Sequence, residues 1–444
     1  MFRRELRSGS VAVVGGGYVG LTTAVCLAHL GHRVSCTDID HGRIERIRRG
    51  EIDQHEPGID EFVAEHGGTN LSFHTRLDTA ANGAHTAFLC LPTPGRPDGS
   101  TDLRSVDMLA HQLRSLPAPP STVVIKSTVP PGTARELAAA FGPGTAVVSN
   151  PEFLREGSAV HDFLHPHRIV IGSDSPAAAQ HVTELYDGVR APVIRTDPTS
   201  AEIIKHGANF FLAMKLSYTN MLSELCEHLG ANITEVLRGV GRDPRIGPSY
   251  LRPGPGWGGP CLPKDVRALA SLETALGCDL PLVDAALRAN THHQRHVVDL
   301  VERSIGRPVG GSRIAVLGLT FKHGTNDLRN SPALAVTAML SGRHAHITAH
   351  DPAVTAQDPQ VTAHLALASD AETALDGCDC ALLLTDWPEF AELPWTSIAD
   401  HMRGRTVVDT RDCLDPDALA RAGLRHVRMG LPRNDSRTAA QVSS

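Results

Sequence analysis

A single cysteine lies in the most unusual stretch of the chain. Cys261 follows a run of glycines and prolines that begins at Gly254, and Lys264 and Asp265 come soon after it. A thiol beside cationic groups loses its proton more easily and becomes a nucleophile. An isolated cysteine is more often an inert core residue, but the rigid glycine-rich setting and the adjacent charges favour a reactive thiol here.

A second motif lies near the N-terminus, where the apolar run at residues 11–14 leads into the pattern GxGxxG. In this pattern Gly15 permits a tight turn, Gly17 lets the backbone approach a pyrophosphate, and Gly20 lets the next helix pack close to the sheet. The first turn of that helix includes Tyr18 and Val19, and its N–H groups attract phosphate oxygens. The motif therefore predicts a dinucleotide site.

The choice of dinucleotide depends on Asp38, which ends the next predicted strand. A carboxylate at this spacing accepts hydrogen bonds from the adenosine ribose and repels a 2′-phosphate, which favours NAD over NADP. Arg43 keeps NADP open, because a nearby arginine can hold that phosphate. A structural glycine turn followed by a solvated aspartate is the alternative interpretation.

Regular elements must hold these residues in place, and the N-terminal half alternates short apolar runs with helical stretches. This pattern predicts a parallel sheet covered on both faces, because strands buried on both sides are apolar throughout. The strand candidates are residues 11–14, 33–37, 86–91, 122–126, 146–149 and 168–171.

The pattern changes at about residue 200, where apolar residues recur at helical spacing as far as 229 and predict one long helix. Further helices and a glycine- and proline-rich loop at 248–263 follow. A second α/β unit begins at Arg313, with strand candidates at residues 314–317, 345–349, 381–384 and 406–409. The predicted fold class is α/β, with two Rossmann-like doubly wound parallel-sheet domains joined by a long central helix and a helical middle domain.

Composition restricts the classes of partner. The net charge of −7 argues against a general nucleic-acid binder. No apolar run approaches the roughly 20 residues of a membrane span, and the basic start has no signal-peptide pattern. The nine cysteines are scattered, which favours a reducing cytoplasmic location over a disulfide framework.

No metal site is predicted. Cys378 and Cys380 do not form a CxxC pair, which argues against zinc. His292, His293 and His296 include an i, i+4 pair, but no third ligand is evident, so we interpret this group as a solvated helix surface.

Further motifs follow in order along residues 10–430, and together with the glycine turn and the cysteine loop they resemble the UDP-glucose/GDP-mannose 6-dehydrogenase family. These motifs lie at residues 56–58, 91–94, 127–133, 150–157, 201–209, 318–332 and 408–411. The resemblance implies a four-electron oxidation in which two NAD molecules each take a hydride from C6 of a nucleotide-linked hexose. Cys261 would form first a thiohemiacetal and then a thioester, which water releases as the acid.

The resemblance also implies the catalytic roles. Lys205 and Asp265 would hold a water and manage protons, and Lys205 and Asn209 would stabilise oxyanion charge. Thr128 would position the water and the C6 oxygen, and Glu152 would be the general acid/base.

The binding residues implied by the resemblance form two sets. The cofactor set is Gly15, Gly17, Tyr18, Val19, Gly20, Asp38, Arg43, Pro92, Thr93, Ser127, Thr128, Glu156, Lys264 and Arg329. The substrate set is Glu152, Phe153, Leu154, Lys205, Asn209, Arg245, Tyr250, Leu251, Arg252, Trp257, Gly258, Phe321, Lys322 and Arg411.

Domains and assembly follow from the same resemblance. We predict an NAD-binding Rossmann domain at 1–199, a central helical dimerisation domain with the cysteine loop at 200–305, a sugar-nucleotide-binding domain at 306–432 and a disordered tail at 433–444. Arg245 matches an arginine that crosses a dimer interface to the sugar, and the long apolar helix would form the core of a homodimer.

The preferred sugar nucleotide is left open. The segment beginning at Arg245 and the end of the cysteine loop favour UDP-glucose, whereas TDP-glucose and GDP-mannose remain alternatives. Pro260, directly before Cys261, departs from the small residue common in the family, and its effect has no explanation from the sequence. A non-catalytic sugar-nucleotide-binding protein and a simple two-electron dehydrogenase are the competing functions.

Overall fold

The computed structural model describes residues 9–432 except 53, 55, 357, 359, 362 and 363. The chain divides into two compact units, which we call unit 1 (Met1–Ala208 with Arg267–Leu276) and unit 2 (Asn209–Val266 with Gly277–Ser444). The predicted disordered tail at 433–444 lies outside the described residues. The predicted domain boundaries stay predictions.

The described part of unit 1 is built on an eight-stranded sheet with the order β3-β2-β1-β4-β5-β6-β7-β8. Neighbouring strands run parallel, except that β6 and β7 meet antiparallel through Ser149 and Gly172. The strands are β1 (Ser10–Val14), β2 (Arg33–Thr37), β3 (Leu71–His74), β4 (Thr86–Leu89), β5 (Thr122–Ile125), β6 (Ala146–Ser149), β7 (Ile169–Gly172) and β8 (Val193–Thr196).

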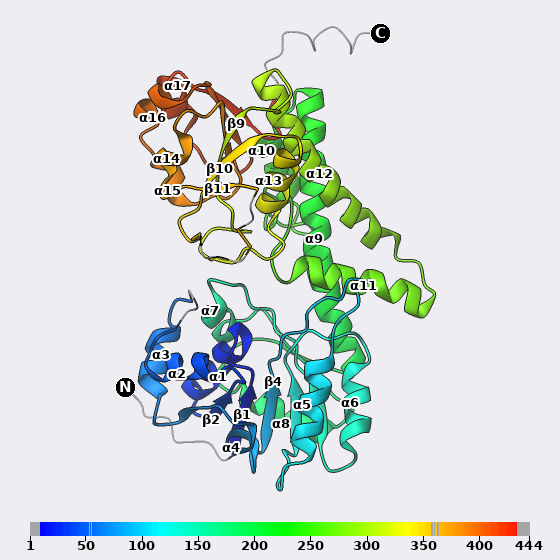
Figure 1. Cartoon of the computed structure of the whole chain (residues 1–444). Coiled ribbons are helices and arrows are strands. Elements are labelled where there is room, and N and C mark those ends of the chain that lie inside the picture. Colours follow the sequence, from blue (N-terminus) through cyan, green and yellow to red (C-terminus); the bar gives the residue numbers. More distant parts are fainter. Residues whose placement is uncertain are drawn as a thin grey trace. The chain divides into compact units, whose positions relative to one another are not determined.

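Helices cover both faces of this sheet, as alternate residues of β1 demonstrate. Val11 and Val13 belong to one apolar cluster, and Ala12 and Val14 belong to another. Successive strand side chains point to opposite faces, so each face has its own core. Figure 1 places the helices accordingly. They are α1 (Tyr18–His29), α2 (His41–Arg48), α3 (Ile59–His66), α4 (Leu77–Ala81), α5 (Arg104–Arg114), α6 (Thr133–Phe141), α7 (Ala159–Leu164) and α8 (Pro176–Leu185).

The described part of unit 2 contains a six-stranded parallel sheet with the order β11-β10-β9-β12-β13-β14. This order repeats that of the first six strands of unit 1, and β9 again sends alternate residues into two cores. The prediction of two doubly wound, Rossmann-like sheets is therefore confirmed. The strands are β9 (Arg313–Leu317), β10 (His346–His350), β11 (Ala366–Leu367), β12 (Cys380–Leu383), β13 (Thr406–Asp409) and β14 (Arg425–Arg428).

Long helices occupy the middle of the chain. The predicted helix at 200–229 is present as α9 (Pro198–Leu229), which begins in unit 1 and continues into unit 2. It is followed by α10 (Ile233–Gly241), α11 (Leu262–Leu276) and α12 (Pro281–Ile305). The later helices are α13 (Pro332–Gly342), α14 (Ala371–Leu375), α15 (Pro388–Ala391), α16 (Trp395–His401) and α17 (Pro416–Arg421). None of the helices in the described ranges is long and apolar enough to cross a membrane.

Candidate active site

The glycine turn between β1 and α1 has the geometry that a dinucleotide requires. Gly15 has a φ of 103°, and a Cβ there would lie 2.3 Å from the carbonyl oxygen of Cys90. At Gly20 a Cβ would lie 1.7 Å from the carbonyl oxygen of Gly15, so only glycine lets α1 begin this close to the turn. A Cβ on Gly17 would meet nothing within 4 Å, which leaves open space beside the N-terminus of α1. Helix N-termini bind phosphate through their N–H groups, so the turn fits a pyrophosphate.

Asp38 lies directly beside this turn. Its Oδ2 atom accepts a hydrogen bond of 2.6 Å from the backbone N–H of Gly16, and it lies 3.6 Å from Nη1 of Arg43. The carboxylate is therefore fixed at the carboxyl end of β2, where a ribose hydroxyl would meet it. Arg43 neutralises part of its charge.

Glu56 connects the glycine turn to the loop after β6. Its Oε1 atom accepts a hydrogen bond of 2.6 Å from the Tyr18 hydroxyl and another from the Gly157 N–H, while Oε2 accepts from Ala159 N at 2.7 Å. Burial and this contact with Glu56 raise the pKa of Tyr18, whose phenol stays protonated; the nearby charge of Glu156 acts in the same direction. Glu56 was predicted only as part of the motif at residues 56–58, and the donors that its buried carboxylate accepts from were not predicted.

The loops after β4 and β5 are tied together at the same edge of the sheet. The Thr93 hydroxyl donates to the carbonyl oxygen of Thr128 at 2.8 Å, and the Ser127 hydroxyl donates to that of Leu91 at 2.8 Å. Pro92 lies between these contacts in the chain. These predicted cofactor and catalytic residues are thus held at the carboxyl end of parallel strands, where such sheets bind ligands.

A buried ion pair joins Glu152 to α9. Nζ of Lys205 lies 3.0 Å from Oε1 of Glu152, and the two side chains are 5% and 8% exposed. Oε2 of Glu152 also accepts from the Leu154 N–H at 2.5 Å. The Phe153 ring lies 5.3 Å from the Lys205 ammonium and stacks under the Arg168 guanidinium. A carboxylate held beside an ammonium can exchange protons with a ligand and stabilise negative charge.

Unit 2 gathers a second set of predicted residues around Asp265. The Asn209 amide donates to Oδ2 of Asp265, and the Lys264 ammonium donates to Oδ1, each at 2.5 Å. Asp265 is 1% exposed, and its N–H donates to the carbonyl oxygen of Cys261 at 3.0 Å, which closes the first turn at the start of α11. Cys261 itself is exposed. The thiol is therefore accessible while the carboxylate behind it is fixed.

The cysteine loop packs against residues that follow strands of the C-terminal sheet. A Cβ on Gly259 would lie 2.8 Å from the Phe321 ring, and one on Gly254 would lie 2.6 Å from the Arg411 guanidinium. A Cβ on Gly258 would lie 2.1 Å from the carbonyl oxygen of Asn330. Gly258 and Gly259 are thus required by close contact with the loop between β9 and α13, which the sequence could not reveal.

Cationic side chains lie close together beside the cysteine loop. Nε of Arg411 donates to the Leu384 carbonyl oxygen at 2.9 Å. Burial lowers the pKa of Arg411, and the charge of nearby Arg252 acts in the same direction, although that of Asp386 opposes both. Lys322 lies over the Phe321 ring at 5.7 Å. Two neighbouring guanidinium groups favour an anionic ligand such as a diphosphate.

Other predicted substrate and cofactor residues are distributed more widely. In the cysteine loop, Trp257 is buried and its indole donates to the Ser217 hydroxyl at 2.8 Å. Tyr250 has a φ of 62° and precedes the buried Leu251. Arg329 pairs with Asp327. Arg245 is 87% exposed and pairs with Asp243 at 2.6 Å, so it reaches none of the other predicted residues within its own unit.

Comparison with known proteins identifies the family. Profiles of the UDP-glucose/GDP-mannose dehydrogenase family match its NAD binding domain at residues 9–190, its central domain at 199–292 and its UDP binding domain at 315–416. The chain belongs to this family. It is an NAD-dependent oxidoreductase of the nucleotide-sugar dehydrogenase type.

Individual relatives agree over nearly the whole length. The chain is 38% identical to the UDP-glucose 6-dehydrogenase of Rhizobium meliloti, covering 95% of this chain and 99% of the relative. It is 36% identical to UDP-glucose 6-dehydrogenase TuaD of Bacillus subtilis, covering 95% and 93%. The solved UDP-glucose dehydrogenase of Pyrobaculum islandicum is 35% identical and has a TM-score of 0.86, with 97% and 99% covered.

One prediction was wrong. His293 and His296 are 2% and 8% exposed and face carboxylates of α9, instead of lying on a solvated helix surface. Only His292, which is 72% exposed, fits that interpretation. The partners Glu224 and Glu227 lie far away in the sequence, on α9, so no local pattern could show the burial.

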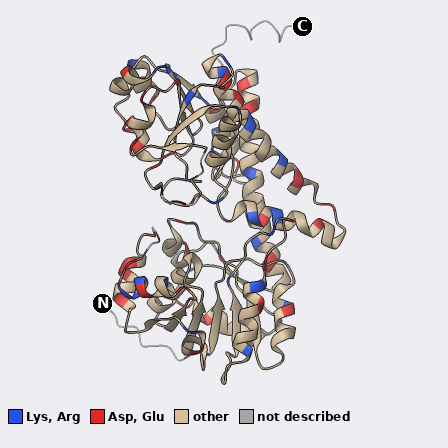
Figure 2. Ribbon diagram, viewed as in Figure 1, with Lys and Arg blue, Asp and Glu red and all other residues tan. Residues whose placement is uncertain are grey.

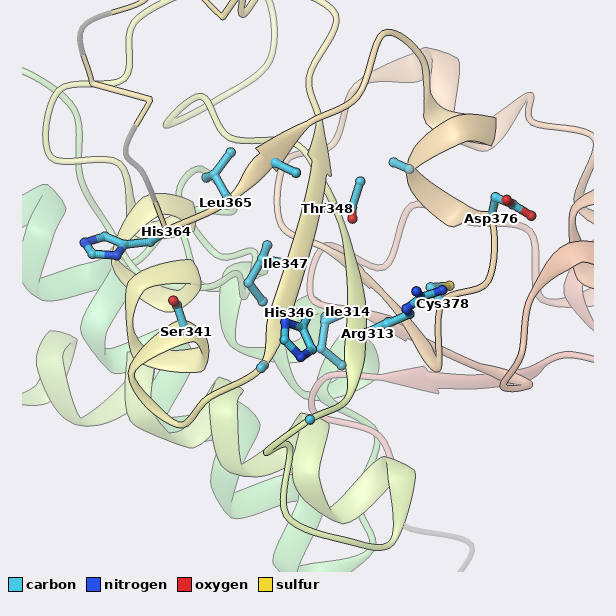
Figure 3. A pocket seen from close by; sticks show the side chains of 14 residues that line it. Arg313, Ile314, Ser341, His346, Ile347, Thr348, His364, Leu365, Asp376 and Cys378 are labelled. Atoms are coloured by element: carbon cyan, nitrogen blue, oxygen red, sulfur yellow. The ribbon is translucent and has the colours of Figure 1, made fainter.

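A pocket of about 900 Å³ in unit 2 is shown in Figure 3, and none of the predicted site residues is among the residues that line it. Arg313, Ile314, His346 and Ile347 line it at the starts of β9 and β10, so it opens at the amino ends of the strands. Ligands of doubly wound sheets bind at the carboxyl ends. The pocket therefore contributes nothing to the candidate active site.

The described residues bring one group of metal-ligand side chains together, namely His29, Glu65 and His66 at the ends of α1 and α3. Nδ1 of His29 and Nε2 of His66 already lie 3.3 Å apart, at hydrogen-bonding distance. The group contains none of the predicted site residues. Figure 2 shows acidic and basic residues intermixed over each unit.

Proposed function

We propose that this chain oxidises the C6 alcohol of UDP-glucose to the carboxylate in two successive hydride transfers, through a thiohemiacetal and a thioester on Cys261. The observation that carries the proposal is the exposed Cys261 thiol at the start of α11, backed by the buried Asp265, which accepts hydrogen bonds from Lys264 and the buried Asn209. Burial raises the pKa of thiols such as Cys26, Cys36 and Cys90, which makes them inert.

The chemistry requires a nucleophile for its second half. In the first oxidation the C6 hydroxyl loses a proton and C6 loses a hydride, which leaves an aldehyde. An aldehyde offers no hydride from a carbinol until a nucleophile adds, so the Cys261 sulfur forms a C–S bond and the oxygen takes a proton. Loss of the second hydride from C6 and of the proton from the thiohemiacetal hydroxyl leaves a thioester. Water then adds, the C–S bond breaks, and the thiol is restored as the acid leaves. NAD supplies the hydride acceptor in both oxidations.

The buried pair of Glu152 and Lys205 suits the proton transfers. We assign Glu152 as general acid/base for thioester hydrolysis, because its carboxylate is held by both Lys205 and the Leu154 N–H. Lys205 would stabilise oxyanion charge, with Asn209 one helical turn further along α9. Asp265 would position the water with Lys205, and Thr128 would orient the C6 oxygen.

The binding roles are proposed on the same basis. The glycine turn, Asp38 and the tied loops after β4 and β5 would hold the cofactor, together with Glu156, Lys264 and Arg329. Phe321, Lys322, Arg252 and Arg411 would hold the nucleotide and its diphosphate, since these cations gather beside the cysteine loop. Phe153, Leu154, Tyr250, Leu251, Trp257 and Gly258 complete the proposed sugar-nucleotide set.

The choice of UDP-glucose is supported by the relatives named above, which are UDP-glucose dehydrogenases. We further propose a homodimer in which Arg245, exposed in the single chain, reaches the partner's sugar site. That arrangement would explain why, among the described residues, the Arg245 side chain pairs with Asp243 and otherwise remains exposed.

A substrate panel with NADH detection tests the proposal. UDP-glucose, TDP-glucose, GDP-mannose and UDP-N-acetylmannosamine are supplied separately with NAD, and NADH is counted per sugar consumed. We expect the highest kcat/KM with UDP-glucose and two NADH per sugar. One NADH per sugar would indicate a two-electron dehydrogenase, and no NADH would indicate a binding protein; either result contradicts the proposal. A clear preference for another sugar nucleotide would reject UDP-glucose as the substrate.

A further inference from the structure

The cysteine loop, taken as residues 254–261, is held at its first residue, Gly254, by a buried histidine. Nε2 of His293 on α12 lies 2.9 Å from the carbonyl oxygen of Gly254, and Nδ1 lies 2.5 Å from Oε1 of Glu224 on α9. We propose that His293, as an imidazolium paired with Glu224, is a positioning residue that holds the Cys261 loop in its reactive arrangement. The inference rests on the proposed role of Cys261 and adds to it a residue that makes the loop sensitive to protonation.

The hydrogen-bond partners of His293 require both ring nitrogens to donate. A backbone carbonyl oxygen has no proton to give, and an ionised carboxylate only accepts. Burial acts to raise the pKa of Glu224, but the hydrogen bond with His293 and the charges of His293, His296 and His292 together outweigh burial and leave that pKa lowered. Both partners of His293 are therefore acceptors when Glu224 is ionised, and the proposal places a proton on each ring nitrogen. With only 2% of His293 exposed, water cannot replace either partner cheaply.

Neutral hydrogen bonds fix the rest of the loop to the same two helices. They join Asn220 to the Gly254 N–H (3.1 Å), Asn290 to the Trp257 N–H and carbonyl (2.9 and 3.0 Å) and Ser217 to the Trp257 indole (2.8 Å). These contacts do not titrate in the physiological range. His293 is the charged anchor of this set, and it acts where the loop begins.

Loss of one proton from His293 would break this arrangement. A neutral ring has a single N–H, which Glu224 would retain because a charged acceptor forms the stronger hydrogen bond. The Nε2 lone pair would then face the Gly254 oxygen, and the two acceptors would repel each other. The other charged and titratable groups around the pair are Glu227 on α9, His292, His296 and Arg303 on α12, and Arg411, which packs against Gly254.

A substitution of Glu224 separates the charge of His293 from its hydrogen bonds. In Glu224→Gln the amide N–H can donate to Nδ1, so a neutral His293 still donates from Nε2 to Gly254. Both hydrogen bonds of His293 would therefore persist although its ring is neutral. In His293→Gln no side chain can donate in both directions with this geometry. His292→Gln is the matched control, because His292 is the neighbouring residue, contacts Glu224 at 3.4 Å and is 72% exposed.

The experiment uses the full chain and follows tryptophan fluorescence, to which the loop residue Trp257 contributes, together with the alkylation rate of Cys261 by iodoacetamide, as pH rises from 6 to 9. For wild type and His292→Gln we expect a transition in emission, together with a rise in the alkylation rate beyond the rise that ionisation of the thiol itself produces. For Glu224→Gln we expect neither the emission transition nor the additional rise in alkylation. The same transition in Glu224→Gln as in wild type would overturn the proposal, and this comparison holds even if His293→Gln fails to fold.

Kinetics supply the second readout. A displaced nucleophile can cost about 100-fold in rate for a misplacement of about 1 Å, so His293→Gln should lower kcat by about 10- to 100-fold while NAD affinity stays unchanged. Wild-type kcat in folded His293→Gln would reject the positioning role. Fluorescence and alkylation report on the loop whether or not Cys261 forms a thioester. Normal acid formation by Cys261→Ser would therefore reject the proposed function separately.

Discussion

At the scale of single residues, we expect the Asp38 carboxylate to contribute strongly to the affinity of unit 1 for NAD. Its carboxylate is already oriented by the Gly16 N–H at 2.6 Å. Hydrogen bonds to a charged group contribute about 1.5–3 kcal/mol, so Asp38→Ala should weaken NAD binding by about 10- to 100-fold in a calorimetric titration. Asp40→Ala is the matched control, because Asp40 caps α2 nearby without touching the turn. Unchanged NAD affinity in Asp38→Ala would remove the assignment.

Glycines whose role is to permit a close backbone contact were predictable from the sequence. Gly15 and Gly20 are required by contacts with neighbouring backbone atoms of the same chain, and the spacing of the GxGxxG motif predicts this requirement. His293 was misjudged because its environment comes from α9, which lies far away in sequence. The glycines of the cysteine loop were recognised as rigid, but their contacts with Phe321 and Arg411 depend on tertiary packing. Pro260 still has no structural explanation.

Among the elements, the start of α9 fixes the loop that carries Thr128. Glu202 accepts from the Gly132 and Ala134 N–H groups at 2.6 and 2.8 Å, and His206 contacts the Val129 carbonyl oxygen at 2.9 Å. Burial raises the pKa of Glu202 to about 7, although the two N–H donors act to lower it. The N-terminal part of α9 thus holds the N-terminus of α6 through the Glu202 carboxyl group, whose pKa is about 7.

This pKa gives a pH dependence of stability with a definite sign. Between the ordinary glutamate value of 4.5 and about 7 the folded chain binds more protons than the unfolded chain, so stability falls as pH rises through this window and is level above it. The wild type should lose up to about 3 kcal/mol relative to Glu202→Gln. Urea unfolding at pH 5 and pH 8 measures this difference, with the exposed Glu136→Gln as control. An equal difference at both pH values would contradict the assignment.

Central elements were predicted well and edge elements were not. The buried strands β1, β4, β5, β9 and β12 each contain a continuous apolar run and were found from the sequence. The missed strands β3, β8, β11 and β14 are short and only partly buried, so their sequences lack a continuous apolar run. Parallel pairing with a neighbour defines them, and that pairing is invisible in the local sequence.

For the whole molecule, an apolar stripe on α9 supports the proposed homodimer. Phe211, Tyr218, Met221, Leu225 and Leu229 recur at helical spacing and are each more than two-fifths exposed in the single chain. A stripe of this kind normally packs against a partner. Light scattering should give about twice the mass of one chain, and Leu225→Glu should shift the protein toward monomer. Met108→Glu, at an exposed apolar position on α5, should not. A monomeric wild type would contradict the dimer.

The covalent role of Cys261 is the central claim, and product analysis of Cys261→Ser tests it most directly. Wild type and variant are given UDP-glucose and NAD, and NADH and UDP-glucuronate are followed together. Cys278→Ser serves as control, because Cys278 is also exposed. We predict that Cys261→Ser still binds NAD and substrate but forms the acid slower by orders of magnitude, while Cys278→Ser yields two NADH per sugar at the normal rate. Acid formation by Cys261→Ser at the wild-type rate would contradict the thioester.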